Sequence, residues 1–118
     1  MTKKLKIASV GMKDRDSVVL KQLLNIYNKQ LENWEYVGNF PAQQVIETMG
    51  SQINADVKLV DTDSELGKRA WYFLQAMEEG NSLIELSDTF NRVNYLLVTK
   101  PLMLNIESLV CMLIEYGC

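Results

Sequence analysis

The stretch Val57-Lys58-Leu59-Val60-Asp61 decides the fold that we predict for this chain. A short apolar run with β-branched residues predicts a buried strand, and here it stops at a carboxylate. Similar stretches lie on both sides of it and predict four further strands, at residues 5–10, 34–40, 82–87 and 95–99.

Helical periodicity fills most of the gaps between these strands. Apolar residues recur at spacings of three and four over residues 17–31, 41–53, 64–80 and 105–116. Alternating strands and helices predict an α/β fold with a doubly wound parallel sheet. Only Asp88 to Asn94 separates the fourth strand from the fifth, whereas a parallel crossover needs about 10–12 residues. Either the fourth helix is shortened or missing, or the fifth strand runs antiparallel.

The composition predicts one globular domain and excludes several functions. The chain has 118 residues, a hydrophobic fraction of 47% and a net charge of −3, which argues against a nucleic-acid-binding domain. The cluster Lys3, Lys4 and Lys6 is too short to read as a binding tail. No apolar run is long enough for a membrane span or a signal peptide, so we expect a cytoplasmic protein. Because histidine is absent, Ser-His catalysis and His-ligated metals are excluded.

Three local features give further expectations. Asp16 or Ser17 is expected to cap the first helix. Cys111 is expected to be a small buried residue, because it lies in an apolar stretch. In the run Trp71-Tyr72-Phe73 we expect Phe73 in the core and either Trp71 or Tyr72 turned outward, because adjacent helical residues lie about 100° apart.

Three polar residues follow successive apolar strands: Asp61, Ser87 and Lys100. In a parallel sheet they meet at the carboxyl edge, where open α/β sheets place their ligands. A carboxylate nucleophile, a hydroxyl and an ammonium suit phosphoryl transfer to aspartate. The plainer interpretation is a structural ion pair between Asp61 and Lys100.

These residues resemble the receiver domain of two-component response regulators. The matching stretches are Leu59-Val60-Asp61 for the phospho-acceptor strand, Leu86-Ser87 for the switch residue and Val98-Thr99-Lys100-Pro101 for the lysine-proline motif. The resemblance spans residues 1–118 in element order. It implies a flavodoxin-like five-stranded sheet with strand order 2-1-3-4-5, and it gives Asp61, Ser87 and Lys100 the acceptor, switch and lysine positions.

The sequence departs from the family where receivers bind Mg²⁺. The acidic pair expected after the first strand falls at Gly11 and Met12, which provide no carboxylate. Mg²⁺ requires several hard oxygen ligands, so we predict no metal and no cofactor. Asp14 and Asp16 are the nearest replacements. Asp63 adds negative charge beside Asp61, which opposes phosphate.

A second departure concerns the readout of phosphorylation. Leu97 occupies the position where receivers often carry a rotating aromatic residue, and Tyr95 lies two residues earlier. Together with the shortened fourth helix, this leaves the usual output face incomplete. The departures therefore affect both the phosphorylation of a receiver and the surface that transmits it.

The sequence leads to a first hypothesis and two alternatives. The first is a non-enzymatic regulatory module that binds a protein partner or an output domain, such as the N-terminal part of a transcription regulator or signalling scaffold. The alternatives are a working phospho-acceptor with Asp61 as its acceptor, and a flavodoxin-like cofactor binder that uses residues 11–17. The apolar final helix, preceded by Leu102 to Leu104, predicts a homodimer. We expect no direct contact with nucleic acid or membrane.

Overall fold

The protein is described by a computed structural model that covers residues 4–48, 53–77, 83–87, 97–100 and 102–117. Five parallel strands form one sheet in the order β2-β1-β3-β4-β5. Their bounds are β1 Leu5–Val10, β2 Trp34–Phe40, β3 Val57–Asp61, β4 Leu83–Ser87 and β5 Leu97–Thr99. The predicted flavodoxin-like topology is therefore confirmed.

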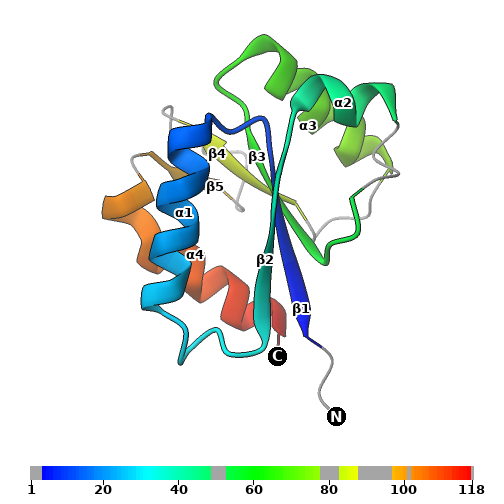
Figure 1. Ribbon diagram of the computed structural model, residues 1–118. Coiled ribbons are helices and arrows are strands. Elements are labelled where there is room, and N and C mark those ends of the chain that lie inside the picture. Colours follow the sequence, from blue (N-terminus) through cyan, green and yellow to red (C-terminus); the bar gives the residue numbers. More distant parts are fainter. Residues whose placement is uncertain (1–3, 49–52, 78–82, 88–96, 101, 118) are drawn as a thin grey trace.

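Helices cover both faces of this sheet, as Figure 1 shows. The helices are α1 Asp14–Ile26, α2 Ala42–Glu47, α3 Glu65–Met77 and α4 Leu102–Gly117. One core cluster joins α1 and α4 to the sheet through residues such as Leu20, Leu59 and Leu109, and the other joins α2 and α3 through Val45, Val60 and Leu74. All five residues of β3 are buried because it is the central strand between two helical layers.

The direction of the fifth strand is settled by its register. Glu85, Leu86 and Ser87 pair in parallel with Leu97, Val98 and Thr99. The antiparallel alternative is therefore wrong. The predicted short crossover over residues 88–94, and Tyr95, lie outside the described residues.

Helix boundaries differ from the predictions at two places. The second helix ends at Glu47, although the apolar pattern predicted that it continues toward Ile53. The last helix begins at Leu102 and not at Asn105, and Asn105 itself has the non-helical angles φ −119° and ψ 15°. Leu102 is buried, whereas Met103 and Leu104 are exposed at 65% and 80%.

Three predictions about single side chains need correction. Neither Asp16 nor Ser17 caps α1, because the helix begins at Asp14 and its N-cap residue, Lys13, makes no side-chain cap bond. Cys111 is exposed, because the neighbouring positions Leu109, Val110 and Leu113 face the sheet. In the aromatic run of α3, Trp71 is buried, Tyr72 faces outward and Phe73 is only half-buried.

Within the part of the chain that the structure describes, no helix has the length and apolar content that a membrane crossing requires.

Candidate functional site

The carboxyl edge of the sheet brings together the three residues predicted from the strand ends. Asp61 ends β3, Ser87 ends β4 and Lys100 follows β5 directly. The register places Asp61 beside Leu86 and Ser87 beside Thr99, so the strands end at similar heights. The backbone N–H of Lys100 also donates to the carbonyl of Ser87, at 3.1 Å. The predicted convergence at this edge is confirmed.

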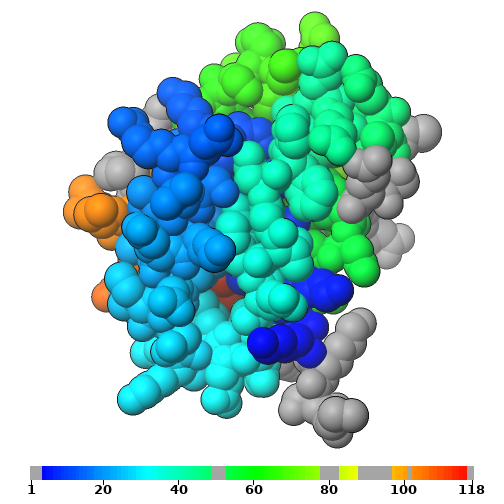
Figure 2. Space-filling view, in the orientation of Figure 1, coloured from blue at the N-terminus to red at the C-terminus, as the bar shows by residue number. Residues whose placement is uncertain are grey.

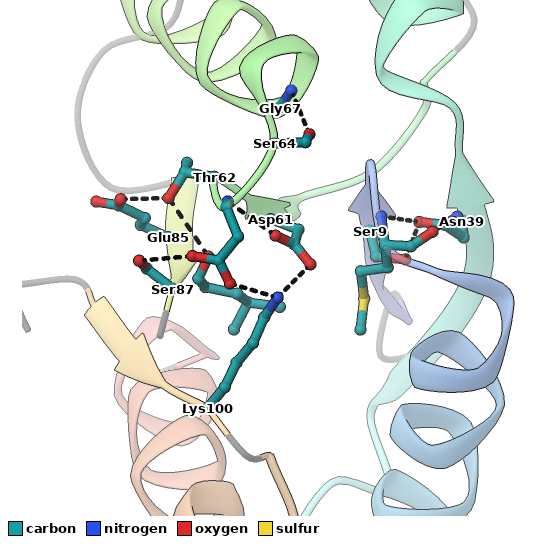
Figure 3. A network of polar contacts seen from close by, with 12 residues as sticks. Ser9, Asn39, Asp61, Thr62, Ser64, Gly67, Glu85, Ser87 and Lys100 are labelled. Carbon is teal, nitrogen blue, oxygen red and sulfur yellow. Dashed lines mark hydrogen bonds and ion pairs between the residues drawn. The ribbon is translucent and has the colours of Figure 1, made fainter. Parts of the chain in front are cut away.

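The ammonium of Lys100 is held between two carboxylates. Its Nζ lies 2.6 Å from Oδ2 of Asp61 and 2.7 Å from Oδ2 of Asp63. Figure 3 shows the lysine reaching from β5 toward the end of β3. The side chains of Lys100, Asp61 and Asp63 are 17%, 7% and 28% exposed, so this triad is largely shielded from water.

The remaining oxygens of the two aspartates are also occupied. Oδ1 of Asp61 accepts the backbone N–H of Asp63, at 3.0 Å. Oδ1 of Asp63 accepts the hydroxyl of Ser87, also at 3.0 Å. The four side chains thus form a continuous chain from Ser87 through Asp63 and Lys100 to Asp61. Asp63 was predicted only as an unfavourable charge, yet it lies at the centre of this chain.

The triad changes the protonation behaviour of the lysine. Burial lowers the pKa of Lys100, but hydrogen bonds and charge from Asp61 and Asp63 outweigh it, and the pKa is raised above its ordinary value of 10.5. Lys100 is therefore a firmly held cation at neutral pH. It partly neutralises two carboxylates that would otherwise repel each other.

The loop after β3 is tied to neighbouring elements on both sides. The backbone N–H of Thr62 donates to the carbonyl of Leu86 at 3.0 Å, and its hydroxyl donates to Glu85. Ser64 caps α3 by accepting the N–H of Gly67 at 2.9 Å. A Cβ at Gly67 would lie only 1.9 Å from the carbonyl oxygen of Asp61, so only glycine fits there. These contacts fix the backbone of Asp61.

The loop after β1 contains the two positions predicted to lack metal ligands. Gly11 has φ +73°, a conformation that favours glycine, and its N–H donates to the carbonyl of Phe40. The side chain of Met12 is buried in the core. Its backbone N–H and C=O are both bound by the side-chain amide of Asn39, at 3.2 and 2.9 Å. At these positions the chain therefore has a glycine without a side chain and a buried methionine whose backbone is hydrogen-bonded to Asn39.

A second polar network lies beside this loop. Ser9 is fully buried and donates to Oδ1 of Asn39 at 2.9 Å, as Figure 3 shows. Its hydroxyl is also hydrogen-bonded to the hydroxyl of Tyr36, at 2.6 Å, which in turn bonds the hydroxyl of Ser17 at 2.9 Å. This network joins β1, β2 and α1 with neutral groups alone.

The predicted replacement ligands do not gather at the site. Asp14 and Asp16 lie in the first turn of α1, where their charges favour the helix N-terminus. Among the residues that the structure describes, no group of three or more acidic, cysteine or histidine side chains is arranged to hold a metal ion. The carboxylates of α1 therefore do not complete a cation site with Asp61 and Asp63.

Sequence reasoning missed the roles of Asn39 and Tyr36. Both residues lie within the edge strand β2, where a polar side chain is not by itself a sign of a buried network. The serine in the buried part of the first strand, between Ala8 and Val10, could have indicated this network, because a buried hydroxyl needs a hydrogen-bond partner.

A scan of protein-family models and a search of curated protein sequences both give no match to this chain.

Proposed function

We propose that this chain is a degenerate receiver domain that acts as a signalling and regulatory protein-interaction module, independently of Mg²⁺-dependent aspartyl phosphorylation. In this proposal the chain is not an enzyme. The flavodoxin-like topology and the convergence of Asp61, Ser87 and Lys100 support the receiver resemblance. The observation that carries the loss of phosphorylation is the loop after β1, where Gly11 and the buried side chain of Met12 stand at the positions of the metal-binding carboxylates.

Asp61 is poorly placed to attack a phosphoryl group. Its two oxygens are engaged by Lys100 and by the N–H of Asp63, and its side chain is almost fully buried. An incoming phosphoryl group would compete with Asp61 for the ammonium of Lys100. It would also meet the negative carboxylate of Asp63, which shares that lysine.

Among the residues that the structure describes, no cluster around Asp61 is arranged to hold a metal ion. Phosphoryl transfer depends on a metal ion that neutralises the developing charge. The receiver positions for its ligands are Gly11 and Met12, and the buried side chain of Met12 contributes no hard oxygen. Asn39 holds the backbone of Met12 in this arrangement.

Exposed apolar residues supply a surface for a partner protein. On α4, Met103 and Leu104 are followed by Ile114 and Tyr116, which are also exposed, and Tyr72 stands out from α3. Aromatic and methionine side chains are enriched in protein interfaces. We propose that α4 contacts a protein partner, an output domain or a second copy of this chain, and that the domain binds neither nucleic acid nor membrane.

The phosphorylation test uses the folded domain with Mg²⁺ and excess acetyl phosphate, followed by intact-mass spectrometry. We expect no added phosphoryl group, while a receiver with an intact acidic pair is modified in parallel. Beryllofluoride with Mg²⁺ should leave the tryptophan fluorescence unchanged. Stoichiometric phosphorylation that disappears in Asp61→Asn would contradict the proposal and favour the phospho-acceptor alternative.

The partner surface is tested by Met103→Glu and Leu104→Glu, with Val18→Glu as the control. Val18 is similarly exposed, at 57%, but lies on α1. Sedimentation of the unmodified chain at high concentration reports self-association, which the α4 variants should abolish and the α1 variant should retain. A strict monomer at all concentrations would rule out the homodimer.

A further inference from the structure

A groove of about 450 Å³ lies between α1 and the edge strand β2. Figure 2 shows this hollow, with the red C-terminal part of α4 visible at its floor. It is lined by residues near the start of β2, including Trp34, whereas Asp61 lies where β3 ends. Because the strands are parallel, the groove and the Asp61 site belong to opposite ends of the sheet.

Two aromatic rings line one side of the groove, and both are held by other contacts. Trp34 packs against the ring of Tyr116 with centroids 5.8 Å apart, and its backbone N–H donates to the carbonyl of Leu31. The hydroxyl of Tyr36 is fixed by Ser9 and Ser17. Since these rings are already ordered, a ligand that contacts them loses little free energy to side-chain ordering.

The rest of the groove combines an apolar floor with a polar rim. Ile7, Leu24 and Leu31 are buried residues that line it. The rim carries the amides of Gln22, Asn25 and Asn28 and the ammonium of Lys21. None of the described residues that line the groove is acidic, although the whole chain has a net charge of −3. The local charge therefore favours an anionic ligand over a cationic one.

We propose that this groove binds a small, flat aromatic carboxylate. The aromatic ring lies against Trp34 and Tyr36, and the carboxylate faces Lys21 and the rim amides. The volume falls in the range of about 300–1,000 Å³ that is usual for small-molecule sites, which are mainly apolar with a few directing polar groups. This binding does not depend on the function proposed for the Asp61 site.

The test titrates 2-naphthoate into the ¹⁵N-labelled chain and follows the two indole N–H signals, assigned with Trp34→Phe. We expect the Trp34 signal to shift with a dissociation constant of about 1 mM or tighter. The signal of Trp71 should stay in place, because Trp71 is buried in the other core cluster. A titration to the solubility limit that leaves Trp34 unmoved would overturn the proposal.

Charge recognition is tested with Lys21→Gln and with the neutral probe 2-naphthamide. Either change should weaken binding about two- to fivefold, the usual effect of an exposed ion pair. Lys29→Gln is the matched control, because Lys29 is also exposed but does not line the groove. Equal affinity for the acid and the amide, or no effect of Lys21→Gln, would overturn the assignment of an anionic ligand.

Discussion

The ammonium of Lys100 bonds Oδ2 of Asp61 at 2.6 Å across 39 residues of sequence, and the same ammonium bonds Asp63 at 2.7 Å. One cation thus serves two carboxylates at the edge of the sheet. Because the ammonium is shared and shielded, loss of the lysine would leave two negative charges facing each other.

Lys100→Met should destabilise the domain by about 3 kcal/mol, the usual cost of leaving a buried charge unpaired. The double variant Lys100→Met with Asp61→Asn should be more stable than Lys100→Met alone, because one of the facing charges is removed. Urea denaturation measures both values. Lys68→Met is the control, since Lys68 pairs with Glu65 at 3.8 Å on the surface and should contribute less than about 1 kcal/mol.

Asp63→Asn should cost less than Asp61→Asn. The side chain of Asp63 is 28% exposed against 7% for Asp61, so water compensates more of its lost charge. The amide can still accept the hydroxyl of Ser87. Thermal unfolding of the two variants under identical conditions compares them, and a lower melting temperature for Asp63→Asn would contradict the assigned burial.

The stability should fall at high pH because of Lys100. Its folded-state pKa is raised above 10.5 by Asp61 and Asp63, against the lowering effect of burial. The folded protein therefore keeps this proton when the unfolded chain loses it, so the stabilisation is complete below about pH 10.5 and disappears as pH rises through the folded-state pKa. Unfolding free energies from about pH 9 to pH 11.5 should fall more steeply for the unmodified chain than for Lys100→Met. Parallel curves would show that the lysine makes no such contribution.

Gly67→Ala should be strongly destabilising, by about 3 kcal/mol, because the new Cβ would lie 1.9 Å from the carbonyl oxygen of Asp61. Helix propensity alone predicts the opposite sign, a gain of about 1 kcal/mol for alanine over glycine. Chemical denaturation therefore separates the two effects by sign. A stabilised variant would mean that α3 can move away from β3 without cost.

Tyr36→Phe should cost about 1–2 kcal/mol, because it removes the hydroxyl that bonds Ser9 and Ser17. Ser9 keeps Asn39 as a partner, which limits the loss. Tyr72→Phe is the matched control, since Tyr72 is 68% exposed, and it should leave the unfolding midpoint unchanged. Equal effects of the two substitutions would contradict the importance of the network.

The apolar strands and amphipathic helices made most of the fold predictable. Period and spacing identify β1, β3 and β4 because buried strands must be apolar, and β3 ends at the carboxylate that Lys100 binds. The errors concern contacts with distant elements. Cys111 lies in an apolar run, but only the packing of α4 shows that it faces outward. Ser17 looked like a helix cap, but it bonds Tyr36 from another element.

By itself, the sequence determined the element order, the central strand Val57–Asp61 and the absence of acidic residues at Gly11 and Met12, because these depend on residue type and local periodicity. Only the tertiary structure decided that β5 is parallel and that Lys100 pairs with two aspartates. It also showed that the side chain of Asn39 is hydrogen-bonded to the backbone of Met12. Such contacts join residues far apart in the chain, and their partners are set by strand register and helix packing, which local patterns do not encode.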